Sequence, residues 1–407
     1  MAFRNLRKNK RRTWITLFSI GFGLLLAMTF TGIGDSGYTK MINGAARLGS
    51  GHLSIVPSGY IETPALDKTI QDTEEKIALL KKYDHIDACV VRIQGQAMVA
   101  TPRDSGGATF VALDPGTETS DTAYFLEYIK EGKLFDRDDT FGIVIGRTMS
   151  DRLKVGIGEK IVYTTTDKHG EITSGLARVS GIFESGSKEV DGYFIILPLN
   201  RMRDLLGYNN DEATLLAIFL DDHHRSEHLK NRLQSEMNDS SCEVTTWRET
   251  MPDMASFVAL DSSMNYLFQI IIFLLIAAGI LNTILMSVLE RTRELGIMLA
   301  IGMSPVRVVG LIMAEAFWLG ILGIVSGIII TAPLYYYLHI FGIDFSGLIH
   351  EDTDVAGVVF DSIIYNDLRL ESFLFIITGA FIITLLSGIY PAWKAGRLAP
   401  VESIKTI

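Results

Sequence analysis

Cysteine is scarce in this chain of 407 residues, which contains only Cys89 and Cys242. Two cysteines allow at most one disulfide, and two that lie so far apart in a sequence are more often independent than paired. A disulfide between Cys89 and Cys242 stays possible if the part of the chain that carries them lies in an oxidising compartment.

Basic charge is scarce as well. The formal net charge is −10, and removing the six basic groups of residues 1–12, which include no acidic residue, leaves −16 on the remainder. These six groups are Arg4, Arg7, Lys8, Lys10, Arg11 and Arg12. Nucleic-acid surfaces need clustered cations that displace counterions. The charge balance therefore argues against a nucleic-acid surface.

Long runs of the sequence have little or no charge. The run from Trp14 to Ile33 has none, and comparable apolar runs fill residues 266–289, 306–338 and 371–391. At about 1.5 Å per residue, each run is long enough as a helix to cross a bilayer core of roughly 30 Å. This excludes a purely soluble protein and predicts four transmembrane helices, the first at residues 13–34 and the last ended by Pro391.

The basic tail at residues 1–12 sets the predicted topology, because basic residues in short loops stay on the inner side of the membrane. A basic start before an apolar run also describes a signal peptide, but this run is longer than the typical 7 to 15 residues or so, and no A-x-A site follows it. We therefore predict a retained first helix. Both termini then lie in the cytoplasm, with an inner tail at residues 392–407 and a short acidic outer loop at residues 339–370.

The segment between the first two helices, residues 35–265, has ordinary mixed composition and is long enough to bury a core of its own. Its alternating apolar residues and turn signals predict a mixed α/β domain with helical stalks at both ends. We expect an outer subdomain, residues 50–114 and 212–248, interrupted by an inserted subdomain, residues 115–211. The predicted fold class is a membrane α-helical protein with four transmembrane helices and a large periplasmic α/β domain between helices 1 and 2.

Residues 290–305 separate the second and third helices and lie on the cytoplasmic surface in this topology. Apolar residues recur there at helical spacing, at Leu295, Met298, Leu299 and Met303. We predict an amphipathic helix outside the bilayer that offers its apolar face to a cytosolic partner. The alternative is a turn with no partner.

Six residues of the spans are candidates for helix packing or for lining a membrane cavity: Phe268, Phe273, Asn282, Glu315, Gly323 and Gly327. A carboxylate at the depth of Glu315 costs a few kcal/mol and normally faces protein or water, unless it snorkels to the inner interface. Gly323 and Gly327 form a small-xxx-small pair that lets another helix approach closely. Asn282 is a candidate for an interhelical hydrogen bond, and the stretch that carries both phenylalanines suits acyl chains as well as bulk lipid.

Two stretches of the sequence partly match known catalytic or nucleotide-binding motifs. GIFESGSK, from Gly181 to Lys188, approaches a P-loop, but its lysine is one place late, no serine or threonine follows it, and it lies in the exported part. His224, Glu227 and His228 spell H-x-x-E-H, as in one class of zinc protease, but the run is hydrophilic throughout and favours a solvated helix start. We predict no catalytic, cofactor-binding or metal-binding residue in this chain.

Three stretches together resemble a known family. They are FRNLRKNKRRTWITLFSI (Phe3 to Ile20), ERTRELGIMLAIGMSPVRVVGLIMAEA (Glu290 to Ala316) and YPAWKAGRLAPVESI (Tyr390 to Ile404). They resemble the ABC transporter permeases of the FtsX/MacB-like superfamily, which includes lipoprotein-releasing permeases, macrolide exporters and a cell-division type. The resemblance implies a coupling helix between helices two and three that docks on an ATPase, and a periplasmic domain split by an inserted subdomain. The ATPase-coupling residues it implies are Arg291, Glu294, Leu295, Gly296, Met298, Leu299 and Gly302.

No ATP-binding motif is present, so ATP and Mg are expected on a separate cytosolic ATPase in two copies, beside a second permease copy or paralogue. Domain size and GHLSIVPSGY, from Gly51 to Tyr60, look most like the lipoprotein-releasing permeases. That subtype implies extraction of a lipoprotein from membrane lipid in the bacterial inner membrane, and a periplasmic carrier or adaptor. Macrolide-exporter-like efflux and FtsX-like regulation of a periplasmic hydrolase stay open as alternatives.

Overall fold

The computed structural model of this chain describes residues 10–137, 139–237, 239–344, 354–355, 358–359 and 363–397. It divides into a helical unit, residues 1–37, 259–345 and 363–407, and an α/β unit, residues 38–258 and 346–362. Most of the predicted basic tail (residues 1–9), much of the acidic outer loop (residues 345–353) and most of the inner tail (residues 398–407) lie outside the described residues.

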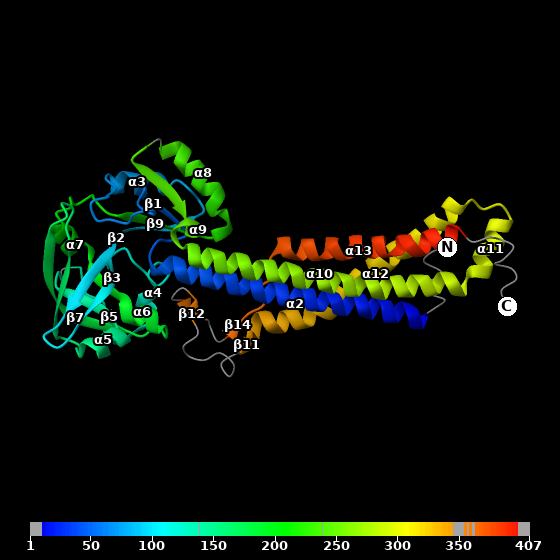
Figure 1. Ribbon diagram of the computed structural model, residues 1–407, viewed down its shortest axis with the longest axis horizontal. Coiled ribbons are helices and arrows are strands. Elements are labelled where there is room, and N and C mark those ends of the chain that lie inside the picture. The colour runs from blue at the N-terminus through cyan, green and yellow to red at the C-terminus, as the bar shows by residue number, and fades with distance from the viewer. Residues whose placement is uncertain are drawn as a thin grey trace. The chain divides into compact units, whose positions relative to one another are not determined.

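The helical unit is built from long apolar helices that lie side by side (Figure 1). Four of the described helices are long and apolar enough to cross a membrane, namely α2 (Lys10–Leu48), α10 (Pro252–Glu290), α12 (Pro305–Phe341) and α13 (Leu370–Gly396). The first two contain 39 residues each, well beyond the 20 or so that a bilayer core requires. The segments predicted as stalks are therefore continuations of the same two helices.

The last of these helices does not end at Pro391, contrary to the sequence-based prediction, but continues to Gly396. A proline inside a helix removes one backbone donor, and transmembrane helices tolerate this loss where neighbouring helices cover the site. Pro391 is buried, and Ala392 and Ala395 belong to the core of the bundle. Packing of the last turn thus outweighs the lost hydrogen bond.

Small residues bring α12 close to α2. A Cβ atom added at Gly323 would lie 2.5 Å from Ile20 Cδ1, and one added at Gly327 would lie 2.5 Å from Leu24 Cδ1 and 3.3 Å from the Cα of Gly21. Contacts under about 3 Å force a neighbour to move. The small-xxx-small pair of α12 therefore lies where this helix contacts α2, and Gly21 is the small residue of α2 at this contact.

A ten-stranded sheet runs through the α/β unit in the order β10-β1-β9-β2-β3-β8-β5-β7-β4, with β6 pairing with β2 and β7. Its first part is antiparallel and consists of β10 (Cys242–Thr246), β1 (Leu53–Pro57), β9 (Leu215–Leu220) and the first half of β2 (Ile86–Ala100). The helical elements of this part are α3 (Thr73–Leu80), η1 (His223–Arg225), α8 (Ser226–Met237) and α9 (Trp247–Thr250).

The second part of the sheet contains two parallel pairs, β3 with β8 and β5 with β7. Its strands are β3 (Ser105–Leu113), β4 (Ile129–Gly132), β5 (Gly142–Gly146), β6 (Lys160–Thr166), β7 (Ile172–Phe183) and β8 (Phe194–Pro198). Its helices are α4 (Tyr124–Glu127), α5 (Arg147–Leu153), α6 (Lys188–Tyr193) and α7 (Leu199–Leu206). Short strands follow α12: β11 (Ile343–Asp344) pairs with β14 (Ile363–Ile364), and β12 (Asp354–Val355) with β13 (Val358–Val359).

Strand β2 belongs to both parts of the sheet. Residues 86–92 pair with β9, and residues 93–100 pair with β3. The prediction placed residues 50–114 in the outer subdomain, whereas β3 pairs with β8, a strand of the predicted insert. The two predicted subdomains thus share one continuous sheet across the boundary at residue 114.

A buried ion pair fixes the end of α2 within the α/β unit. The Arg92 guanidinium donates to both Glu118 oxygens, at 2.8 and 2.9 Å, and the two side chains are almost completely buried. The same guanidinium donates to the carbonyl oxygens of Gly49 and Thr122, at 2.7 Å each. Buried charges are stable only when paired and hydrogen-bonded, and Arg92 meets both conditions.

Candidate functional site at the linker between α10 and α12

The linker between the second and third spans folds into one short helix, α11 (Thr292–Ala300). Gly302 lies just beyond its end with φ of +104°, a backbone conformation that favours glycine, and nothing surrounds the position of its missing Cβ. Pro305 then occupies the first turn of α12, where its missing N–H costs nothing. The sequence IGMSP therefore stops one helix and starts the next.

The predicted apolar face of α11 points into the helical bundle. Leu295 is only 2% exposed and belongs to the bundle core, and Gly296 is buried. Met298, Leu299 and Met303 are half-buried and pack against the same core. Leu295 is therefore covered within this chain, and its predicted role in coupling to an ATPase stays a prediction.

The opposite face of the linker combines exposed apolar and charged side chains. Ile301 is 81% exposed, and Ile297 and Val306 are exposed as well. Arg293 and Glu294 of α11 are also exposed. Periodicity did not select Ile297 and Ile301, although their spacing of four residues is the signal that reveals a second apolar stripe.

Arg291 anchors the start of α11 to α12. Its Nη1 donates to Glu315 Oε1 at 2.8 Å, and its Nε donates to Glu294 Oε2 at 3.0 Å. Burial lowers the pKa of the Arg291 guanidinium, but the hydrogen bonds to Glu294 and Glu315 outweigh burial and raise it. Glu315 is buried and accepts from Arg291, so of the alternatives for this residue the structure supports a contact with protein, which includes the linker.

The remaining candidates in the spans lie apart from one another. Asn282 is exposed, and its neighbour Thr283 makes the interhelical hydrogen bond instead, accepting from Thr16 at 3.0 Å. Phe268 is exposed, with its ring centroid 5.0 Å from that of Phe30 on α2. Phe273 packs against α13, where a Cβ added at Gly379 would lie 2.7 Å from its ring.

A row of exposed aromatic side chains follows one side of α2. Trp14, Phe18 and Phe22 recur every four residues, and each is more than half exposed. Together with Arg11, Ile15 and Ser19 they line an open groove of about 580 Å³. Large apolar patches of this kind mark surfaces for lipid or for another protein.

The P-loop-like stretch cannot hold a phosphate in the observed conformation, because a carboxylate already fills it. Asp191 is buried, and its Oδ1 accepts from the Ser185 amide at 2.9 Å and from the Ser185 hydroxyl at 2.7 Å. Burial raises the pKa of Asp191, and hydrogen bonds from Ser185 and Gly186 oppose that rise. Donors of the loop that a phosphate would need are thus satisfied within the chain.

The three residues of the H-x-x-E-H motif, His224, Glu227 and His228, do not gather into a metal-binding cluster. Glu227 and His228 are exposed on α8. Among the described residues, the side chains that gather with metal-ligand spacing are Asp222, His223 and His224, whose donor atoms all lie within 4.8 Å of one another.

Cys89 and Cys242 are both free in the structure, so they do not form the disulfide that the sequence left open.

Four helices fit to cross a membrane, with an α/β domain between the first two and an amphipathic linker before the third, define a multi-pass membrane protein with an extracytoplasmic domain. Residues 13–236 match the MacB-like periplasmic core domain, and residues 266–400 match the FtsX-like permease C-terminal domain. The chain belongs to the FtsX/MacB-like family of ABC transporter permeases, as predicted, and is a non-catalytic membrane subunit.

Three relatives match nearly the whole chain at low identity. An uncharacterized ABC transporter permease of Methanocaldococcus jannaschii is 21% identical over 99% of this chain and 96% of its own length. The lipoprotein-releasing system transmembrane protein LolC of Xylella fastidiosa strain Temecula1 is 21% identical over 100% of this chain and 98% of its own. The macrolide export ATP-binding/permease protein MacB of Nitrobacter winogradskyi is 22% identical over 99% of this chain, which spans 59% of that protein.

Proposed function

We propose that this permease couples ATP hydrolysis by a separate cytosolic ATPase to movements of its extracytoplasmic domain, and that these movements release lipoproteins from the membrane. The observation that carries the first part is the two-sided linker. One side of the linker is fixed to the bundle through Leu295 and Arg291, and the other exposes Ile297 and Ile301. A partner that binds the exposed side can move the helices through the fixed side.

The ion pair with Glu315 gives this transmission a physical route. Arg291 precedes α11 directly, and Glu315 lies within α12, so a displacement of the linker acts on α12 as well as on α10. Both partners are largely buried, which makes the pair a strong restraint compared with an exposed one. We infer two ATPase copies, each held by one permease copy.

Lipoprotein release is supported by the similarity to LolC and by the apolar surface of α2. The row Trp14, Phe18 and Phe22 offers an aromatic surface that acyl chains can contact within the membrane. Two permease copies that face each other through α2 and α10 would enclose a cavity open to the outer leaflet. An acylated substrate would leave this cavity for a carrier when the helices close.

Macrolide-exporter-like efflux is the second candidate, because the family model that covers residues 13–236 is the MacB-like one. The two functions differ in cargo and in the extracytoplasmic partner rather than in mechanics. Binding of a cell-wall hydrolase with no transported cargo would instead indicate a regulatory role.

The coupling half of this proposal is tested with Ile301→Asp in the permease co-expressed with its cognate ATPase. We expect the charge to weaken co-purification by about tenfold or more, equivalent to roughly 1.4 kcal/mol, and to abolish permease-stimulated ATP hydrolysis. Ile172→Asp is the matched control, because Ile172 is 80% exposed against 81% for Ile301 and lies in the α/β unit. Equal ATPase binding by both variants contradicts the proposed docking face.

The cargo is tested separately, with the complex in lipid nanodiscs. On addition of ATP, the complex should release a bound triacylated lipoprotein to a soluble carrier. The unacylated form of the same lipoprotein should not bind to the complex. If ATP is hydrolysed but neither lipoprotein binding nor release occurs, the lipoprotein assignment fails while the coupling mechanism stands. Stimulation by a macrolide together with a periplasmic adaptor would then favour efflux.

A further inference from the structure

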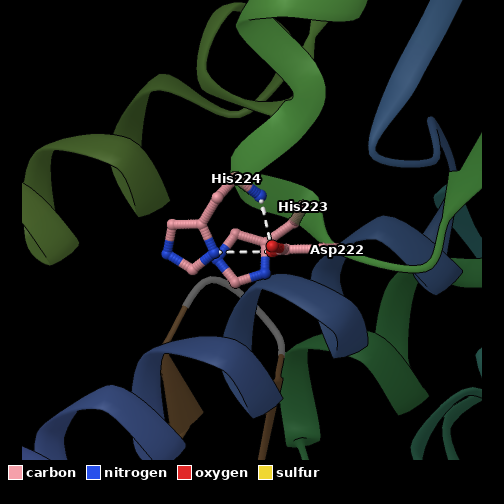
Figure 2. Close-up of side chains that lie close together, drawn as sticks. All are labelled: Asp222, His223 and His224. Carbon is pink, nitrogen blue, oxygen red and sulfur yellow. Dashed lines mark hydrogen bonds and ion pairs between the residues drawn. The ribbon is translucent and has the colours of Figure 1, made fainter. Parts of the chain in front are cut away.

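Three consecutive side chains converge where β9 leads into α8. Asp222 is half-buried, His223 is 5% exposed and His224 is exposed, and all of their donor atoms lie within 4.8 Å of one another. Figure 2 shows both imidazoles turned toward the Asp222 carboxylate. The ring centroids of the two histidines are 3.9 Å apart. One position beside the carboxylate is therefore within reach of two nitrogen donors.

The hydrogen bonds of Asp222 show how the cluster is held without an ion. Its Oδ1 accepts from the His224 backbone amide at 3.0 Å and from His224 Nδ1 at 2.7 Å. Since a carboxylate only accepts, a proton on Nδ1 fills the space between the two side chains.

The surroundings concentrate further histidines at the same corner. His52 has its ring centroid 6.4 Å from that of His223, His85 bonds to Asp221 at 3.1 Å, and His228 follows on α8. Five of the eight histidines of the chain thus gather around the end of β9. His52 itself cannot supply a ligand atom in this state, because its two ring nitrogens contact the Leu220 amide and Asn43 Oδ1, both at 3.0 Å.

We propose that Asp222, His223 and His224 bind one divalent transition-metal ion, with zinc the best match. Two imidazoles and one carboxylate form a nitrogen and oxygen donor set of the kind that zinc accepts, and such sets disfavour calcium, which takes six to eight oxygens. Zinc would replace the proton between His224 and Asp222. Water would fill the remaining position, as in other sites with three protein ligands.

The required rearrangement is small. Zinc bonds of about 2.0 to 2.1 Å in a tetrahedral site place neighbouring donor atoms about 3.3 Å apart. His224 Nδ1 and Asp222 Oδ1 are 2.7 Å apart, so they need to separate by about 0.6 Å. His224 is exposed and lies at the start of a helix, where its side chain can make this movement.

Isothermal titration of the full-length protein in detergent with zinc chloride tests the site. We expect one zinc ion per chain, and an affinity at least about tenfold weaker in His224→Ala and in Asp222→Asn, which keeps an acceptor for the helix start. His85→Ala and His228→Ala are matched controls, since both histidines are exposed near the cluster but outside it, and they should change the affinity less than twofold. Calcium chloride should give no heat of binding.

Trp247 provides a second readout that does not depend on stability. Its ring centroid is 6.4 Å from that of His223, so copper bound at the cluster should quench its fluorescence. We expect the quenching to disappear in Trp247→Phe and in His224→Ala and to persist in His228→Ala. Zinc binding that survives His224→Ala and Asp222→Asn unchanged, or an absence of zinc binding in the wild-type protein, overturns the assignment. The site does not depend on the transported cargo.

Discussion

Arg291 and Glu315 lie 24 positions apart in the sequence and meet at 2.8 Å, which ties the linker between α10 and α12 to the third span. The pair is largely buried, whereas the second partner of Arg291, Glu294, keeps 60% of its side chain exposed. One arginine therefore offers an internal comparison between a buried and an exposed contact.

The first prediction concerns this comparison. Glu315→Gln removes the buried charge and should lower the free energy of unfolding by about 1 to 3 kcal/mol, because Arg291 loses its main counter-charge. Glu294→Gln should cost only about 0 to 0.5 kcal/mol, since water screens the exposed pair. Chemical denaturation of the purified protein measures both, and a double-mutant cycle with Arg291→Gln isolates the coupling. Equal effects of the two substitutions on the free energy of unfolding would contradict a stabilising role of the buried Arg291–Glu315 ion pair.

The second prediction separates the two faces of α11. Leu295→Ala should destabilise the bundle by about 2 to 4 kcal/mol, because it leaves a cavity among α10, α11 and α12. Ile297→Ala, on the exposed face, should stay within about 0.5 kcal/mol of wild type. The same two variants should show the reverse order in binding to the ATPase. Thermal unfolding without the partner, followed by co-purification with it, distinguishes folding from docking.

The third prediction tests the close approach of α2 and α12. Gly327→Leu adds a side chain where the first carbon alone would lie 2.5 Å from Leu24, so the two helices must separate. Gly310→Leu lies on the same helix with nothing within 4 Å and serves as the control. We expect Gly327→Leu to lower the midpoint of thermal unfolding by several degrees and Gly310→Leu to leave it unchanged. Similar midpoints would mean that this crossing contributes little.

The fourth prediction concerns thiol reactivity. Burial raises the pKa of Cys89 to about 12 and also raises the pKa of Cys242. Since the thiolate is the reactive form, a raised pKa leaves nearly all of the thiol protonated at pH 8, where only about one Cys89 in ten thousand would be ionised. Maleimide should label both cysteines slowly in the folded protein and rapidly in denaturant. Rapid labelling of the native protein at pH 7 would contradict the burial.

The spans and the exported domain were predictable because their signals are local. An apolar run of 20 or more residues has few alternatives to a membrane helix, and the alternation in residues 160–166 predicts β6 residue by residue. The family followed from three stretches, and the match of residues 266–400 confirms it. The lipoprotein-releasing subtype stays a prediction at about one-fifth identity.

The linker shows what periodicity leaves undetermined. A repeat of 3.6 residues says that Leu295 and Leu299 share a face, but not whether that face meets the protein's own bundle or another chain. The contact between Arg291 and Glu315 was likewise hidden, because it depends on how two helices are placed in space. Asp191 illustrates the same limit, since only the folded loop shows that it occupies the space a phosphate would need.

Strand β2 has a mechanical consequence for transport. Its 15 residues are bonded along the first half to β9 and along the second to β3, so the partner of the strand changes between Arg92 and Ile93. A bend of β2 at this point would break neither row of backbone hydrogen bonds, whereas sliding along either partner strand would break a whole row at once. Relative movement of the two parts of the sheet is therefore expected as a bend of β2 rather than as the unpairing of strands.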